Sequence, residues 1–87
     1  MRQLSGSPEY RKLLHYLIEA RMKTGLTQQQ LGALLQRPQS FVAKYELGER
    51  RLDVLDYVQV SHALGLEAGI GLSQLFPLTS DTPHEPA

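Results

Sequence analysis

The chain has 87 residues, which fits one small domain with a modest core, and its lack of cysteine excludes disulfide bonds and thiolate metal sites. Its first residues lack the apolar core of a secretory signal, and no run approaches the roughly 18 apolar residues of a membrane span, so we expect a cytoplasmic protein. The formal net charge is zero, yet all nine Lys and Arg residues lie between Arg2 and Arg51, where the net charge is +5, and the rest carries −5. Such asymmetry is typical of a protein that faces a polyanion at one end, although a short chain also acquires it by chance.

The first helix is predicted from Pro8 to Thr24. Ser7 can cap it, Pro8 suits the first helical position because its missing N–H costs nothing there, and Gly25 can end it. The apolar residues at helical spacing are Leu13, Leu14, Leu17 and Ile18.

A second helix is predicted to follow Thr27, which can form a capping box with Gln30. Gly32 is unusual inside a helix, because glycine costs about 1 kcal/mol there relative to alanine. We therefore expect another helix to cross at close range beside Gly32. The predicted buried stripe consists of Leu31, Leu34 and Leu35.

The third helix is predicted from Pro38 to Leu47, and Gly48 ends it. Val42 and Tyr45 are three residues apart and form its best core pair. This assignment leaves Phe41 at a partly exposed boundary.

Two further helices complete the prediction. The fourth begins at Asp53, a good cap, and runs to Leu64, where Gly65 stops it. A short fifth helix is expected around Leu72 to Phe76, and Gly69 and Gly71 make its start hard to place.

The connection between the second and third helices spans only three residues, Gln36 to Pro38. So short a link makes two helices cross steeply, as in a helix-turn-helix, and turns the N-terminal half of the third helix outward. No strand pattern competes, so we predict an all-α fold in which residues 1–76 form one helix-turn-helix domain. Residues 77–87 are rich in proline and poor in apolar side chains, so we expect a disordered tail there.

The outer face of the third helix carries side chains suited to DNA. Gln39 can pair with adenine, Ser40 can donate or accept, and Lys44 can reach O6 and N7 of guanine in the major groove. We therefore assign Gln39, Ser40 and Lys44 to base contacts. Taken alone, such a face is more often plain solvated surface. Its position on a crossed helix pair, in the basic half of the chain, favours DNA.

Four further residues around this helix are suited to phosphate. Gln28 lies at the positive end of the second helix, and three arginines lie on flanking loops, where they would neutralise phosphates and supply salt-dependent affinity. The alternatives are a polar helix start and a solvated basic turn. The predicted contacts to the DNA backbone are Gln28, Arg37, Arg50 and Arg51.

Residues 10–66 resemble the Xre/Cro/CI family of helix-turn-helix DNA-binding domains. The resemblance rests on Gly25 to Leu66, GLTQQQLGALLQRPQSFVAKYELGERRLDVLDYVQVSHALGL. This stretch is similar to the family's Leu-Thr-Gln start, small residue at the helix crossing, S-x-V-x-K-x-E-x-G reading helix, and capped helix ending Ala-Leu-Gly. It implies a compact five-helix bundle of the lambda-repressor-like type, whose dimers bind palindromic operators.

The resemblance also implies roles by position. Gln28 matches a phosphate-contacting glutamine, and Gln39, Ser40 and Lys44 match positions that contact base edges. Arg21 and Glu46 match an ion pair that ties the first helix to the third in relatives. Such a pair contributes little if it is exposed, whereas loss of one partner costs several kcal/mol if the pair is partly buried, and we favour the buried version.

Two positions depart from the family pattern. Gln36 and Pro38 stand where the turn usually carries glycine and then a capping serine. Gln36 must therefore adopt a left-handed or otherwise unfavourable backbone, or the turn geometry differs slightly.

The sequence leaves two functions open. The first is a transcriptional regulator, most simply a repressor that reads a palindromic operator as a homodimer, because one helix offers only about three or four base contacts. The second is an antitoxin or other protein-binding adaptor whose acidic C-terminal segment orders on a partner. The predicted dimer surface comprises Ile70, Leu72, Leu75 and Phe76. Leu72 and Leu75 could equally close the core of the monomer.

We expect neither enzymatic activity nor a cofactor or metal. His15, His62 and His84 fall on three different predicted elements, with no nucleophile, carboxylate pair or ligand spacing around them. Double-stranded DNA is the partner that the sequence favours.

Overall fold

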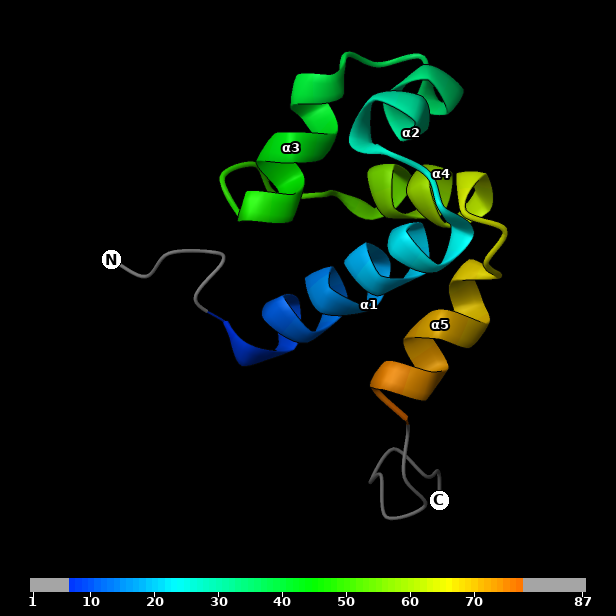
Figure 1. The fold of residues 1–87 in the computed structure, drawn as a ribbon. Helices are drawn as coiled ribbons and strands as arrows, with labels where there is room; N and C mark the ends of the chain where they lie inside the picture. The colour runs from blue at the N-terminus through cyan, green and yellow to red at the C-terminus, as the bar shows by residue number, and fades with distance from the viewer. Residues whose placement is uncertain (1–6, 78–87) are drawn as a thin grey trace, which may run out of the picture.

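The computed structural model describes residues 7–77, which contain five helices (Figure 1). In chain order these are α1 (Pro8–Thr24), α2 (Gln28–Leu35), α3 (Gln39–Leu47), α4 (Val54–Ala63) and α5 (Ala68–Leu75). No strand occurs among residues 7–77, and the predicted all-α fold is confirmed. The predicted tail lies outside the described residues from position 78 onward.

Local capping side chains set the bounds of the first helices, as predicted. The Ser7 hydroxyl accepts the N–H of Tyr10 at 3.2 Å, and Gly25 ends α1 in the left-handed region. Thr27 and Gln30 form the reciprocal capping box that starts α2. Each of these contacts satisfies backbone groups that a helix end leaves without partners.

The turn between α2 and α3 takes the first of the two alternatives left open by the sequence, a left-handed backbone at Gln36. Gln36 adopts φ 59° and ψ 42°, and its N–H caps α2 by donating to carbonyls of the preceding turn. Pro38 is the N-cap of α3, which therefore begins one residue later than predicted, at Gln39. Proline supplies no side-chain cap, but its φ of −66° already suits a helix start.

Gly32 lies where α2 meets this turn, and it is buried. A Cβ at this position would lie 2.8 Å from the carbonyl oxygen of Arg37 and 3.3 Å from the backbone nitrogen of Gln39. Only glycine therefore lets the start of α3 approach α2 this closely, as the sequence analysis expected.

The prediction for α5 is wrong at its start, because the helix begins at Ala68 rather than near Leu72. The side chain of Glu67 caps it by accepting the N–H of Ile70 at 2.7 Å. Gly71 lies inside the helix, where a Cβ would approach the Tyr57 hydroxyl to 2.9 Å. This glycine marks close packing of α5 rather than a break in it.

One buried core joins the helices. Val42 and Tyr45 are fully buried within it, as predicted. Phe41 is only 7% exposed, so the prediction of a boundary position is wrong. The buried apolar residues are Tyr10, Leu14, Leu17, Leu31, Phe41, Val42, Tyr45, Leu52, Tyr57, Val60 and Leu64.

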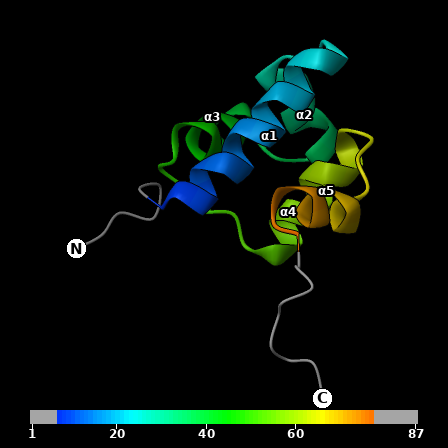
Figure 2. The same ribbon diagram turned by 90° about the horizontal axis from the view of Figure 1, so that it is seen from below.

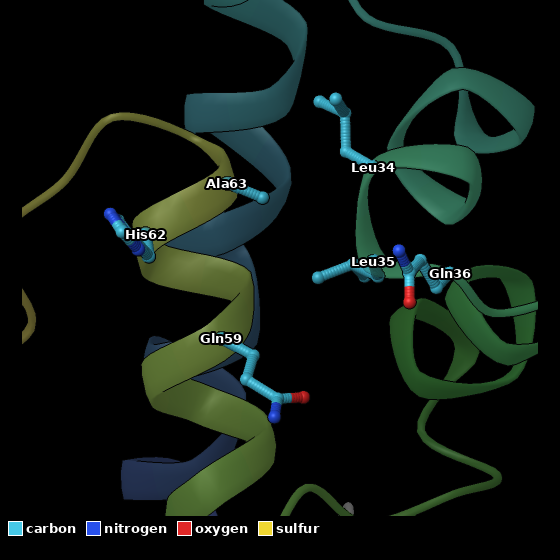
Figure 3. A pocket seen from close by; sticks show the side chains of 6 residues that line it. All are labelled: Leu34, Leu35, Gln36, Gln59, His62 and Ala63. Carbon is cyan, nitrogen blue, oxygen red and sulfur yellow. The ribbon is translucent and has the colours of Figure 1, made fainter.

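The predicted stripe of α2 is only partly buried. Leu31 is in the core and Leu35 packs against it, but Leu34 is 58% exposed. Leu31 and Leu35 are one turn apart and share a face, whereas Leu34 falls at its edge. Leu34 borders an open groove of about 420 Å³, in which Gln59 and Ala63 of α4 point toward α2 (Figure 3).

The helices place the predicted DNA-contacting face of α3 and the predicted dimer surface of α5 on different sides of the molecule. Figure 1 shows α2 and α3 together on one side and α5 on the opposite side, and Figure 2 shows α5 next to α4. Within residues 7–77, no helix combines the length and apolar character that crossing a membrane requires.

Candidate nucleic-acid interface

The third helix has a buried face and an exposed face. Val42 and Tyr45 anchor the inner face, while Gln39, Ser40 and Lys44 are all exposed. None of these three side chains is packed under another element, so the outer face of α3 is available to a ligand.

A chain of side-chain contacts connects α1, α2 and α3 behind this face. Arg21 donates from Nε to Oε2 of Glu46 at 2.7 Å and from Nη2 to Oε1 at 3.0 Å. Gln28 donates to the same Oε1 at 2.9 Å, and Gln39 donates to Oε1 of Gln28, also at 2.9 Å. The chain of contacts therefore reaches from a partly buried ion pair to a residue on the exposed face.

The Arg21–Glu46 pair is well shielded from water. The two side chains are 12% and 7% exposed, and Arg21 also donates to the carbonyl oxygen of Leu26 at 2.9 Å. The hydrogen bonds to Glu46 raise the pKa of Arg21, against the lowering effect of burial. The pair is therefore partly buried and largely shielded, a setting in which loss of one partner is costly.

Gln28 uses both ends of its amide inside the protein. Its NH2 group donates one hydrogen to Glu46 and retains a second that could donate to a phosphate, while its carbonyl oxygen accepts from Gln39 and orients that side chain. The sequence did not indicate this second role, because Gln28 lies on α2 and Gln39 lies 11 residues further along the chain, on α3.

A second cluster centres on Asp56, which the sequence analysis did not single out. Arg37 donates from Nη2 to Oδ1 of Asp56 at 3.0 Å, and Nη2 of Arg50 lies 3.5 Å from Oδ2. The carboxylate also accepts the N–H of Asp53 at 3.1 Å in the capping box of α4. Burial on its own would raise the pKa of Asp56, but the N–H of Asp53 and the Arg37 guanidinium outweigh it and lower this pKa below its usual value.

The two guanidinium groups of this cluster also explain why Phe41 is buried. They lie over its ring, with centroid distances of 4.2 Å for Arg37 and 5.0 Å for Arg50. The edge of the ring meets Tyr45 at a centroid distance of 5.5 Å. Cations over an aromatic face are attracted by its quadrupole, so the arginines cover what would otherwise be exposed apolar surface.

These contacts divide the predicted site residues into groups. A groove of about 300 Å³ beside α3 is lined by Arg37, Pro38, Ser40, Phe41, Lys44 and Arg50. Gln28 and Gln39 lie together in the contact chain described above. Arg51 is separate from both groups, because its guanidinium lies 5.4 Å from the ring centroid of Tyr10.

The four residues of the predicted dimer surface differ in exposure. Ile70 and Leu72 are exposed, whereas Leu75 and Phe76 are partly buried. Lys12 of α1 donates to the carbonyl oxygen of Leu75 at 3.0 Å, and its Nζ lies 5.6 Å from the Phe76 ring centroid. The end of α5 is thus tied to α1, while Ile70 and Leu72 in its middle remain exposed.

The described residues offer little for other chemistry. Across 7–77 no group of three or more His, Asp or Glu side chains could hold a metal ion. His15 and His62 are exposed on separate helices, and His84 lies outside the described residues.

Comparison with known proteins adds two findings. A helix-turn-helix family model matches residues 17–70. The fold is similar to the solved structure of an XRE-family like protein from Pseudomonas syringae pv. tomato str. DC3000, with 46% sequence identity and a TM-score of 0.76 over 77% of this chain and 82% of that one. No curated protein matches the chain.

Proposed function

Because the chain belongs to the Xre/Cro/CI-type helix-turn-helix family of DNA-binding proteins, we propose that it is a transcriptional repressor that binds a palindromic operator as a homodimer. The family is not enzymatic, in agreement with the prediction from sequence. The observation that carries the proposal is the exposed outer face of α3, held on a buried inner face. We assign this activity to the cytoplasm.

In this proposal α3 enters the major groove. Gln39 pairs with adenine, Lys44 reaches O6 and N7 of guanine, and Ser40 donates or accepts at a neighbouring base edge. Gln39 is oriented before DNA arrives, because Gln28 accepts one of its amide hydrogens. Holding a reading side chain in place lowers the entropy lost when it binds.

Phosphate contacts set the position of α3 in the groove. Arg37, Arg50 and Arg51 flank the helix, and Gln28 lies at the start of α2, so these four residues would contact the backbone on both sides of the reading helix. Such contacts supply affinity that depends on salt, whereas base contacts supply specificity.

Dimerisation doubles the number of bases that are read. We propose that α5 supplies the dimer surface through its exposed Ile70 and Leu72, continued by the partly buried Leu75 and Phe76. A two-fold pair then places two copies of α3 in half-sites about one helical turn apart. Residues 1–76 suffice for this activity in our proposal.

Two alanine variants test the assigned base contacts and the assigned phosphate contacts separately. Lys44→Ala should lose preference at one base position, worth about 1–3 kcal/mol, and leave the other positions unchanged. Arg51→Ala should weaken all sequences alike and reduce the slope of log affinity against log salt by about one. Titration of a labelled operator and its single-base variants at several salt concentrations measures both effects. A changed base preference in Arg51→Ala would refute the phosphate assignment.

The dimer surface is tested by charge insertion. Ile70→Lys should shift the sedimenting species from dimer to monomer and weaken operator binding. Leu55→Lys is the matched control, because Leu55 is an exposed aliphatic side chain of the same size as Ile70 but lies on α4. Equal dimerisation of both variants would contradict the assignment to α5.

A further inference from the structure

The carboxylate of Asp56 makes more contacts than the capping of α4 requires. Its capping role is complete with two bonds, from the N–H of Asp53 to Oδ2 and from its own N–H to Oδ1 of Asp53. A neutral acceptor could fill that role. The same carboxylate, only 5% exposed, also faces the guanidinium groups of Arg37 and Arg50.

The two arginines come from opposite ends of the reading helix. Arg37 lies in the turn that precedes α3, and Arg50 lies in the loop that follows it. Both are held against the Phe41 ring and against Asp56 on α4. We call this set of four residues, Arg37, Phe41, Arg50 and Asp56, the arginine clamp.

The clamp leaves its cations accessible. The side chains of Arg37 and Arg50 are 33% and 45% exposed, in contrast to the buried carboxylate between them. A guanidinium has five N–H donors, so each arginine keeps several for a ligand after contacting Asp56. Both border the groove beside α3, together with Ser40 and Lys44.

The charges around this groove match a phosphate group. Arg37, Arg50 and Lys44 carry three positive charges, and Asp56 cancels one of them. An anion that enters the groove meets a positive site whose donors are already placed, and planar guanidinium groups suit the oxygens of phosphate.

We propose that Asp56 is a positioning residue for DNA recognition, which holds Arg37 and Arg50 so that both guanidinium groups face a single backbone phosphate at the groove beside α3. This inference rests on the proposed DNA-binding function. By fixing one phosphate between the two ends of α3, the clamp sets the register of the reading helix against the base pairs. The buried acid thus contributes to specificity although it would repel DNA by charge alone.

The proposal predicts different results for substitutions of two acidic residues, one inside the arginine clamp and one outside it. Asp56→Asn and Glu49→Gln each remove one negative charge near Arg50, but Glu49 is exposed and lies outside the clamp. Glu49→Gln should strengthen binding to operator and scrambled duplexes in parallel and leave their affinity ratio unchanged. Asp56→Asn should bind the scrambled duplex as well as the wild type or better, while its operator-to-scrambled ratio falls by about fivefold or more, the size of a single mismatch.

The experiment measures affinities for a selected operator and a scrambled duplex of equal length at several salt concentrations, with circular dichroism to establish folding. If Asp56→Asn does not fold, Phe41→Leu replaces it, because leucine keeps apolar bulk but removes the ring face; the same fall in the ratio is expected. An unchanged ratio in the folded variant overturns the clamp and leaves the DNA-binding function standing. A wild-type protein that fails to distinguish the two duplexes overturns the proposed function itself.

Discussion

Replacing Glu46 by alanine removes the acceptor of three hydrogen bonds at once. Two come from Arg21 and one from Gln28. After the change, the guanidinium of Arg21 remains in a site where its side chain is 12% exposed and keeps its bond to the carbonyl oxygen of Leu26. The variant therefore leaves a nearly buried cation without its counter-charge.

The magnitude follows from this geometry. Removing one partner of a buried ion pair costs about 3–5 kcal/mol. The retained bond to Leu26 and the remaining access of water reduce that cost, so we expect Glu46→Ala to lower the free energy of unfolding by about 2–4 kcal/mol. For a domain of this size, that corresponds to a fall in Tm of roughly 8–30 °C.

The control is Glu49→Ala, which removes an exposed acid three residues away. Its Tm should stay within a few degrees of the wild-type value, because exposed side chains without buried partners contribute little. Thermal melts followed by circular dichroism compare the two variants in the same buffer. Equal melting temperatures for Glu46→Ala and Glu49→Ala would refute the buried-pair reasoning.

Three other predictions concern stability. Gly32→Ala should lower the free energy of unfolding by about 1–3 kcal/mol, because the clash of a Cβ with the backbone at Arg37 outweighs the gain of about 1 kcal/mol in helix propensity. Urea titrations measure this change, and a stabilised variant would contradict the prediction. The pKa of Asp56 is lower in the folded protein than its ordinary value of 3.8, so its contribution to the free energy of unfolding is complete above pH 3.8 and is lost as the pH falls through the lower folded value. When the stabilities of the wild type and Asp56→Asn are measured at decreasing pH, they should converge below pH 3.8. A difference in stability that stays constant with pH would argue against this prediction. Tyr45→Phe should raise stability by up to about 1 kcal/mol, since the buried Tyr45 hydroxyl has no hydrogen-bond partner among the described residues; a clear loss in Tm would show that this hydroxyl is satisfied.

The local parts of the fold could be predicted from the sequence because the signals are local. Ser7, Thr27 and Asp53 cap helices through residues three positions away, so the starts of α1, α2 and α4 follow from short stretches. The left-handed backbone of Gln36 was expected as one of two alternatives, because Gln36 stands where the turn of the family usually carries glycine. The start of α5 was not, because Gly71 looked like a helix breaker until its packing partner was known.

The candidate site could be predicted only in part. Exposure of Gln39, Ser40 and Lys44 follows from the helical spacing of the core residues beside them. The burial of Phe41 does not, since it depends on arginines that precede and follow the helix. Asp56 was missed because its contact with Arg37 spans 19 residues. Its position three residues after Asp53 was the available signal, and this indicated a helix cap alone.

Selection of bound duplexes from a random pool tests the central claim most directly. We predict enrichment of an inverted repeat whose half-sites lie about one helical turn apart, and loss of preference at one position in each half-site when Lys44→Ala replaces the wild type. A pool that emerges without any enriched sequence, even at low salt, would contradict the account of α3 as a reading helix.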